Sequence, residues 1–445
     1  IAKFLIHFKT DSKFVRFYKT GMMIIPNTPI LVHFKRLALQ VPSHFNQSVM
    51  FSSSKRLNVF TLKASFGILC QYHDMLRAVW NDQQLKVRDV TAGDQFYFEE
   101  HNLKNSSDVA ADMLPLCEKL QASIDITNGP MMRVAVFHLP EKDTMLIVIH
   151  HLVVDGVSWR VIAEDLNKIY STLLQGKFSV GLPKRKCSFA QYAQAINEYA
   201  GSAELQAEES YWRTVADKIN GNKPAGVKLT DEVSYAPFQL DAANSANLIE
   251  NGYKKFNTDI NALLLTALSR AWKEVTGQAF LSVALEGHGR EPFGQQPLAL
   301  ERLVGWFTSI YPVALAYEDG GIRTHVASTQ TMLQTIPNKG FGYGVLANIT
   351  LKEILKCEPL MTFNYLGSFE ESSSDDIFTF DNTLPQGNSA SPENKADTPL
   401  SINCALVNGK LSGALSYDTG VFDESQAYKL CETFVAQLKS LNEQE

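Results

Sequence analysis

The residues whose types and spacing best suit catalysis form the run HHLVVDG at 150–156. Histidine is suited to proton transfer because its unperturbed pKa, about 6.5, lies close to neutral pH. The apolar, β-branched segment 144–149 predicts a buried strand that ends at this run. Side chains alternate along a strand, so one of His150 and His151 faces the packed interior and the other can face a cleft. The run therefore predicts one histidine that is available for acid–base chemistry.

Two other interpretations of the histidine pair stay open from the residues alone. Both imidazoles can be structural groups whose hydrogen bonds are satisfied in the core. A zinc site fits less well, because adjacent histidines cannot easily bind one ion and the sequence offers no evident third ligand. Asp155, in a turn with Gly156, can hold the geometry of the loop.

A second polar cluster, EGHGRE, occupies positions 286–291 and directly follows the predicted strand 279–285. Glu286 offers a carboxyl group, which together with an imidazole would supply both an acid and a base for moving a proton to or from carbon. The alternative from the residues alone is an ordinary surface carboxylate at the end of a strand.

Strands and helices alternate along the chain and predict an α/β fold. Each half contains a strand that delivers polar residues at its end, so we expect the site between two α/β halves, where pockets often form. The predicted parts are an N-terminal linker or tail, an N-terminal lobe with the histidine run, an inter-lobe linker and a C-terminal lobe, at 1–25, 26–200, 201–228 and 229–445. Further helices are predicted at 157–174, 259–276 and 424–441, and further strands at 304–315, 361–366 and 413–417.

The composition is ordinary for a folded protein, with 445 residues, 45% hydrophobic and 20% charged, and a formal net charge of −6. This charge gives no reason to expect a nucleic acid or an anionic membrane as a partner. Residues 1–36 are basic, which we interpret as a solvated linker or the remainder of an upstream domain. No apolar run approaches the roughly 20 residues of a membrane span, and the N-terminus lacks the pattern of a secretory signal.

The six cysteines are scattered and form no CxxC pair. Scattered cysteines in a long chain indicate buried thiols in a reducing compartment, so we expect a cytoplasmic location.

Residues 370–397 are acidic and serine-rich at first and then rich in Asn, Pro and Gly, which predicts a long surface loop of functional or mobile character. GFGYG at 340–344 lacks the strand-then-helix context of a nucleotide fingerprint and predicts a flexible loop. We expect no metal, nucleotide or redox cofactor.

HHLVVDG resembles the HHxxxDG signature of the condensation superfamily of nonribosomal peptide synthetases, which is related to chloramphenicol acetyltransferase. Five segments resemble the epimerization domains of that superfamily and occur in the family's order: HHLVVDGVSWR at 150–160, EGHGRE at 286–291, ERLVGWFTSIYP at 301–312, NKGFGYG at 338–344 and FNYLGSF at 363–369. The resemblance covers nearly everything from about Pro26 onward. It implies two chloramphenicol acetyltransferase-like lobes that form a pseudo-dimer with a central tunnel.

The resemblance implies inversion from L to D at the α-carbon of an aminoacyl or peptidyl thioester, through an enolate. It makes His151 and Glu286 the catalytic residues, on opposite sides of the tunnel, and pairs Asp155 with Arg290 across the lobes. The other residues to which it gives supporting roles are His150, Gly156, Ser158, Trp159, Asn364 and Tyr365. The expected partners are an upstream peptidyl carrier protein domain, which delivers the 4′-phosphopantetheine arm, and adjacent synthetase modules.

One motif departs from the family's pattern. The family opens with Pro-Ile-Gln followed closely by Trp-Phe, whereas this chain has PILVHF at 29–34, without the Gln and the Trp. The resemblance implies no catalytic group in this region, so the difference concerns N-terminal packing or the contact with the carrier.

Two competing functions remain at this stage. A condensation domain would form an amide between two carrier-bound substrates, and a catalytically silent docking module would only recruit other proteins. Glu286 favours epimerization, because aminolysis needs no second proton-transfer group. The sequence leaves open which of His151 and Glu286 takes the proton from the L-form, and whether the substrate is aminoacyl or peptidyl.

Overall fold

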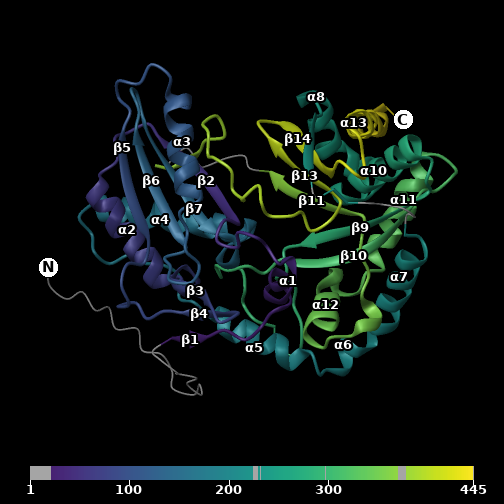
Figure 1. Ribbon diagram of the computed structural model, residues 1–445, viewed down its shortest axis with the longest axis horizontal. Coiled ribbons are helices and arrows are strands. Elements are labelled where there is room, and N and C mark those ends of the chain that lie inside the picture. The colour runs from purple at the N-terminus through teal and green to yellow at the C-terminus, as the bar shows by residue number, and fades with distance from the viewer. Residues whose placement is uncertain (1–21, 224–228, 231, 296, 369–376, 444–445) are drawn as a thin grey trace.

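The computed structural model of the chain describes residues 22–443 apart from 224–228, 231, 296 and 369–376. Most of the basic N-terminal segment, and the acidic start of the predicted 370–397 loop, therefore lie outside the described residues. Two sheets organise the described part, and each is built mainly from one half of the chain (Figure 1). The fold is mixed α/β with two lobes, as the sequence predicts.

The N-terminal sheet has five strands in the order β12-β2-β7-β6-β5. Every residue of its central strand β7 is buried, which explains the continuous apolar run before the histidines. The strands are β2 (Asn46–Ser53), β5 (Tyr97–Asn102), β6 (Met132–His138), β7 (Asp143–His150) and β12 (Thr379–Phe380), and the helices of this lobe are α2 (Val59–Tyr72), α3 (Val109–Gln121) and α4 (Gly156–Leu174). A small sheet of β1 (Met23–Ile24), β3 (Ala78–Asn81) and β4 (Gln84–Val87) adjoins it, so residues 23–24 of the predicted tail pair with β4.

The C-terminal sheet has six strands in the order β10-β9-β11-β13-β14-β8. These strands are β8 (Val233–Gln239), β9 (Phe280–Gly287), β10 (Ser309–Ala316), β11 (Met361–Ser368), β13 (Leu400–Val407) and β14 (Lys410–Asp418). The main helices are α10 (Ile260–Thr276), α11 (Ile322–Gln334) and α13 (Glu424–Glu443). Helix α10 begins where the Asp259 carboxylate accepts a hydrogen bond from the Ala262 amide, and it ends at Gly277, whose φ of 72° only glycine adopts easily.

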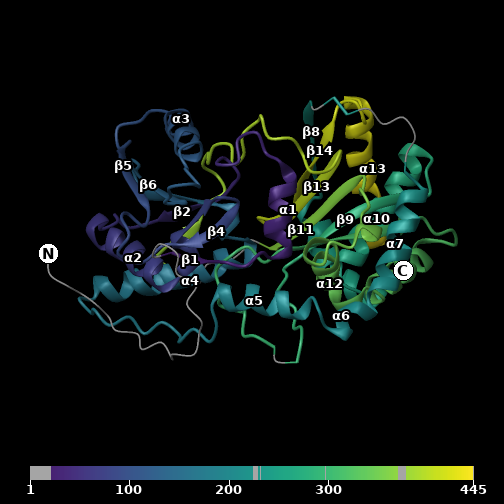
Figure 2. The same ribbon diagram turned by 60° about the horizontal axis from the view of Figure 1, so that its bottom comes forward.

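Several helices lie between or beneath the two sheets. Helix α1 (Pro29–Leu37) stands between the lobes and buries Ile30, Leu31 and Phe34 (Figure 1). Helices α5 (Phe189–Tyr199) and α6 (Ala203–Ala207) lie along the lower side of the molecule, and α7 (Glu209–Gly221) follows them at the side of the C-terminal lobe (Figure 2). The predicted linker 201–228 thus contains two helices. The remaining short helices are α8 (Ala242–Asn247), α9 (Tyr253–Phe256) and α12 (Phe341–Gly344).

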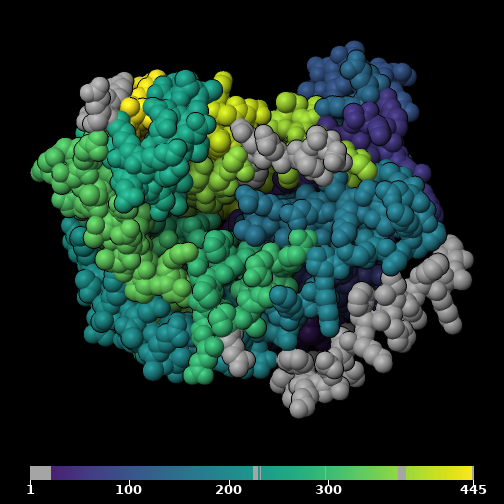
Figure 3. All heavy atoms as spheres, turned by 180° about the vertical axis from the view of Figure 1, so that it is seen from behind, coloured from purple at the N-terminus to yellow at the C-terminus, as the bar shows by residue number. Residues whose placement is uncertain are grey.

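The segment that follows residue 376 corrects the prediction of a surface loop. It leaves the C-terminal lobe and adds β12 to the N-terminal sheet, where Thr379 and Phe380 pair with β2. Phe378 is 2% exposed, and Asp381 accepts hydrogen bonds from Lys142 at 2.6 Å and from Ser52. Viewed from behind, residues of this part of the chain lie between the two lobes (Figure 3). The proline and glycine content correctly predicted an irregular backbone. It did not indicate that the segment packs against the N-terminal lobe.

The long elements that periodicity predicts are confirmed at 144–149, 157–174, 259–276, 279–285, 361–366, 413–417 and 424–441. Two further predictions were wrong. The strand expected at 304–315 begins only at Ser309, because residues 304–308 form an irregular approach to it. The loop expected at 340–344 is the helical turn α12, and within it Phe341, Gly342 and Gly344 are buried.

Five of the six cysteines are buried free thiols, as predicted, and Cys357 is half-buried. Within the described ranges, no helix is long and apolar enough to cross a membrane.

Candidate active site

The two adjacent histidines have different surroundings. His150 ends β7 and is completely buried, and its Nε2–H donates to the Pro42 carbonyl at 2.8 Å while its Nδ1 accepts from the Leu152 amide at 3.2 Å. Burial lowers the pKa of His150 to about 3, so the ring is neutral and both nitrogens are occupied. His150 is therefore a structural residue of the loop.

His151 begins the short turn after β7 and is only partly buried. Its Nδ1 lies 2.9 Å from the carbonyl of Val154, which can only accept, so the ring proton is on Nδ1. Its Nε2 lies 3.0 Å from the amide nitrogen of Gln47, whose carbonyl oxygen accepts from the indole N–H of Trp159 at 2.9 Å. Gln47 consequently donates to His151, and Nε2 carries the lone pair that a base requires.

Aromatic rings surround the His151 imidazole. The ring of Phe45 stacks on it at a centroid distance of 5.4 Å, and the ring of Trp306 lies 4.3 Å away. Burial lowers the pKa of His151, which keeps the ring neutral near pH 7 and ready to accept a proton. The indole N–H of Trp306 is buried and has no hydrogen-bond partner among the described residues, so a donor is free beside the imidazole.

Asp155 and Arg290 join the two lobes just beneath His151. Arg290 donates to both carboxylate oxygens of Asp155, at 2.8 and 3.0 Å, and both side chains are buried. Asp155 also caps α4 by accepting from the Ser158 amide at 2.8 Å, and it accepts from the Phe307 amide at 3.0 Å. The hydroxyl of Ser158 bridges Asp155 to the Gly305 carbonyl. This network fixes the histidine loop against the approach to β10, and removing one partner would leave a buried charge unpaired.

Glu286 lies near the end of β9, in the C-terminal sheet. Its Oε2 accepts a hydrogen bond from the side-chain amide of Asn364 on β11 at 3.0 Å. Burial and, after it, the negative charge of Asp397 raise the pKa of Glu286 to about 7. A carboxyl group with this pKa is close to half protonated at neutral pH and can act as either an acid or a base.

Two glycines, Gly287 and Gly289, allow close packing around the end of β9, next to Glu286. A Cβ on Gly289 would stand 1.6 Å from the Phe307 carbonyl oxygen, and a Cβ on Gly287 would stand 2.7 Å from the hydroxyl of Ser309. Gly289 also has a φ of 66°, which side chains rarely adopt. The alternating glycines therefore let the end of β9 lie directly against the segment that brings Trp306 to His151.

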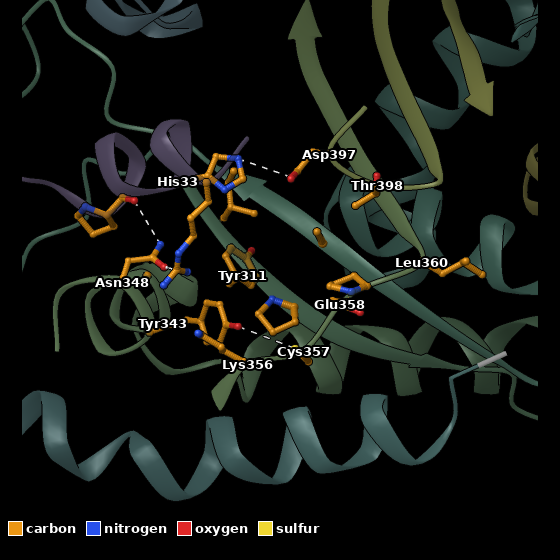
Figure 4. Close-up of a pocket in the computed structure, with 18 of the residues that line it drawn as sticks. His33, Tyr311, Tyr343, Asn348, Lys356, Cys357, Glu358, Leu360, Asp397 and Thr398 are labelled. Carbon is orange, nitrogen blue, oxygen red and sulfur yellow. Dashed lines mark hydrogen bonds and ion pairs between the residues drawn. The ribbon is translucent and has the colours of Figure 1, made fainter. Parts of the chain in front are cut away.

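A pocket of about 580 Å³ opens near the end of β9, and neither Glu286 nor His151 is among the residues that line it. Its wall includes Ala284, which is on the same face of β9 as Glu286, and Ile310, which pairs directly with Glu286 across the β9–β10 ladder. Helix α1 contributes His33, and the segment before β13 contributes Asp397 (Figure 4). Tyr343 of α12 also lines it, so the GFGYG segment borders the pocket as a helical turn.

The residues singled out in the sequence fall into two clusters, one around His151 and the Asp155–Arg290 pair and one around Glu286, and some lie outside both. Asn364 contacts Glu286, and Trp159 acts on His151 through Gln47. Tyr365 is on the opposite face of β11 from Asn364 and packs against the apolar core. Gly156 is exposed at the start of α4, where a Cβ would meet nothing within 4 Å.

Three residues around the site were missed from the sequence. Trp306 lay within a quoted segment but carried no titratable group. Gln47 is 104 residues from its partner His151, and no local pattern marks it. Asp397 ends the segment that the sequence flagged as a long loop.

The arrangement of two α/β lobes, with an HHxxxDG loop tied to the second lobe by an aspartate–arginine pair, defines a condensation-type domain. The family model described as Condensation domain matches residues 25–444, and the chain belongs to this family.

Relatives are multidomain synthases. The chain is 34% identical over 92% of its length to surfactin synthase subunit 1 of Bacillus subtilis (strain 168), and 31% identical over 94% to tyrocidine synthase 1 of Brevibacillus parabrevis. It spans 12% and 40% of these two proteins. Among solved structures, the epimerization domain from the third module of tyrocidine synthetase B is 31% identical, with a TM-score of 0.86 over 94% of this chain and 97% of that one. The condensation domain of the polyketide synthase MokA, at 14% identity and a TM-score of 0.73, shares the fold.

Proposed function

We propose that this domain inverts the α-carbon of an aminoacyl or peptidyl thioester, from L to D, while the substrate is held on a peptidyl carrier protein. The observation that carries the proposal is Glu286, a carboxyl group with a pKa of about 7 that is held by Asn364 on the lobe opposite His151. Inversion by two groups needs an acid and a base, and His151 and Glu286 come from opposite lobes.

The first step breaks the α C–H bond. His151 is neutral and its Nε2 lone pair takes the proton, while the electron pair of the bond moves onto the thioester carbonyl and forms an enolate. Gln47 must give up its hydrogen bond to Nε2 before the substrate proton arrives, so it acts as a placeholder for the substrate.

The second step returns a proton to the other face of the carbon. Glu286, in its protonated form, donates the proton to the α-carbon as the enolate collapses, and it becomes a carboxylate. At the end His151 carries a proton and Glu286 lacks one, and the reverse inversion begins from this state. The D-form is therefore deprotonated by Glu286 in this scheme, and the L-form by His151.

The proposed function implies a carrier domain as a partner, and the cysteines bear on the location. The upstream carrier domain would deliver the substrate on its 4′-phosphopantetheine arm, and adjacent synthetase modules would use the product in building a peptide such as an antibiotic. We also propose a cytoplasmic location, because the buried cysteines are free thiols. The family also includes domains that form amide bonds, and condensation is the second candidate function, because the His151 loop would serve both reactions.

The decisive experiment is α-proton exchange by the Glu286→Gln variant in deuterated water. With His151 intact, we expect L-loaded carrier to keep exchanging its α-proton, while D-loaded carrier loses exchange and net inversion falls by at least about 100-fold. Exchange is measured by mass spectrometry of the released amino acid, and inversion by chiral chromatography.

Equal exchange from both enantiomers, with inversion preserved, would remove Glu286 from the mechanism. Amide formation with a second loaded carrier, without deuterium at the α-carbon, would instead establish condensation. Neither product would indicate docking alone. Glu358→Gln is a matched control, because this carboxylate borders the nearby pocket but is exposed and paired with Lys223 at 2.9 Å.

A further inference from the structure

The segment ERLVGWFT, residues 301–308, leads into β10 and forms neither a helix nor a strand. No ladder of backbone hydrogen bonds fixes its path, so its position depends on contacts with neighbouring elements. Trp306, near its end, packs on the His151 imidazole at a centroid distance of 4.3 Å. The indole N–H of Trp306 has no hydrogen-bond partner among the described residues, so the ring is held by packing and by the backbone around it.

Helix α4, which follows the histidine loop, contacts this segment at two levels. Near the start of the helix, the Gly305 amide donates to the Ser158 hydroxyl at 3.1 Å. Farther along the helix, the Arg302 guanidinium donates to the Asp165 carboxylate. Ser158 and Asp165 are seven residues apart, which is about two helical turns, so they lie on the same face of α4. One face of α4 therefore holds the segment both by its backbone and by an arginine side chain.

Asp165 is a buried carboxylate that joins Arg302 to the core of the N-terminal lobe. One of its oxygens accepts from Arg302, and the other lies 3.0 Å from Nε2 of His73, the residue that ends α2. The side chains of His73 and Asp165 are each 2% exposed. Burial lowers the pKa of His73 against the opposing effect of its hydrogen bond to Asp165, so His73 is a neutral donor. Arg302 then supplies the positive charge that a buried carboxylate requires.

The other charged groups near this pair are paired or exposed. Arg302 also donates to Glu164 at 2.6 Å, but that carboxylate is 63% exposed, and exposed ion pairs contribute little. Asp74, next to His73, pairs with Arg185 at 3.3 Å. Asp165 is thus the partner that can fix the position of Arg302.

We propose that Arg302 is a positioning residue for His151, because its ion pair with Asp165 holds residues 301–308 where Trp306 packs on the imidazole. The inference rests on the proposed function only in giving His151 a catalytic role. A catalytic group must be held close to its productive geometry by supporting contacts, and small displacements are costly. Without the Arg302 contact, the segment would keep its backbone anchor at Gly305 but lose the anchor two turns along α4. The Trp306 ring would then be free to move away from the imidazole.

The test observes the His151 ring in the intact domain without substrate. The domain is labelled with ¹³C in its histidine rings, and the His151 signals are assigned by their loss in His151→Ala. The ring current of the nearby indole displaces these signals. In Arg302→Gln and in Asp165→Asn we expect them to move toward the positions of a free histidine. Arg213→Gln is the control, because this exposed arginine pairs with Glu209 at 3.1 Å on α7, and it should leave them unchanged.

The second readout is α-proton exchange from L-loaded carrier. We expect exchange to fall about tenfold in Arg302→Gln, as misplacement of a catalytic group predicts. Arg302→Lys keeps the charge but not the planar fork of donors, so it should restore part of the rate.

Unchanged His151 signals in both Arg302→Gln and Asp165→Asn would overturn the inference. Arg302 is 35% exposed, so its substitution keeps the test open if the buried Asp165 variant does not fold. A loss of stability or of exchange with unchanged His151 signals would show a merely structural role and would also contradict the proposal. Displaced His151 signals in a domain that exchanges no α-protons would support the inference and count against the proposed function.

Discussion

At the scale of single residues, the adjacent histidines His150 and His151 have different surroundings because a strand ends between them. His150 is the last residue of β7 and points into the core, and His151 begins the following turn at the site. Alternation along a strand was enough to predict that the two imidazoles differ. It could not predict the tautomer, because the partners of His151 include Gln47 from β2.

Separate substitution of the two histidines should separate stability from catalysis. His150→Ala removes a fully buried ring and leaves the Pro42 carbonyl and the Leu152 amide unpaired, so we expect a loss of about 2–4 kcal/mol in the free energy of unfolding. His151→Ala should cost less than His150→Ala, because the His151 ring is only partly buried, and it should abolish α-proton exchange from L-loaded carrier. Urea denaturation and deuterium incorporation measure the two effects. His101→Ala, at a partly buried histidine paired with Glu99, is the control for both.

The burial of His150 also predicts how the free energy of unfolding depends on pH. His150 has a pKa of about 3 when folded and about 6.5 when unfolded, so the unfolded state binds a proton that the folded state excludes. This difference lowers stability as the pH falls from about 6.5 toward 3. We expect His150→Gln to flatten this part of the stability curve relative to the parent protein, and identical slopes would show that His150 is not buried in its neutral form.

At the scale of elements, periodicity predicted the long helices and buried strands well, because each pattern reflects one buried face. It failed where backbone geometry depends on distant contacts. Residues 304–308 are apolar enough for a strand, yet they are held irregularly by hydrogen bonds from Gly305 and Phe307 to Ser158 and Asp155. Close contacts with the same segment also explain the glycines at the end of β9, Gly287 and Gly289, which composition alone would assign to a loose turn.

Gly289 should be far more sensitive to substitution than Gly294 or Gly156. Gly289→Ala places a Cβ 1.6 Å from the Phe307 carbonyl oxygen, so β9 and the approach to β10 must separate, and we expect a loss of about 3 kcal/mol or more. Gly294→Ala has the same φ of 66° but open space, and it isolates the backbone cost of about 1–2 kcal/mol. Gly156→Ala should be nearly neutral. Equal losses at 289 and 294, measured by urea denaturation, would show that the close approach to Phe307 is not rigid.

At the scale of the whole molecule, the two lobes are held together by segments that cross between them. The Asp155–Arg290 pair is one tie, and the chain after residue 376 is another, because Asn394 donates to the carbonyls of Val41 and His44 at 3.1 and 3.0 Å. The resemblance to a known family predicted the lobes, but local sequence could not predict this crossing. Nothing in a segment rich in proline and asparagine indicates which distant strand it will pair with. Asp397 lies at the end of this crossing and lines the pocket, so the tie between the lobes also forms part of the pocket wall.

The segment that crosses between the lobes, residues 377–397, is called the crossing segment. It should stabilise the N-terminal lobe, which it enters, and not the C-terminal lobe, from which it comes. Phe378 belongs to the C-terminal half of the sequence, yet its ring packs on Tyr170 of α4 at 5.2 Å and on Phe51 of β2 at 6.2 Å. Phe378→Ala should therefore cost about 3–5 kcal/mol in the N-terminal lobe. In native-state hydrogen exchange, amides of β2 and β7 should lose protection, because local opening there becomes easier.

A matched substitution in the other core makes this prediction specific. Phe434→Ala removes an equally buried ring of α13 that packs on Phe238 of β8 at 5.3 Å, entirely within the C-terminal lobe. It should reduce protection in β8 and β14 and leave β2 and β7 less affected. If Phe378→Ala instead weakened only the C-terminal sheet, the ring would not be part of the N-terminal core. If both variants reduced protection equally in both sheets, the lobes would open as one cooperative unit, and the crossing segment would not distinguish them. The expected pattern, opposite for the two variants, follows only if residues 377–380 complete the N-terminal core across the gap between the lobes.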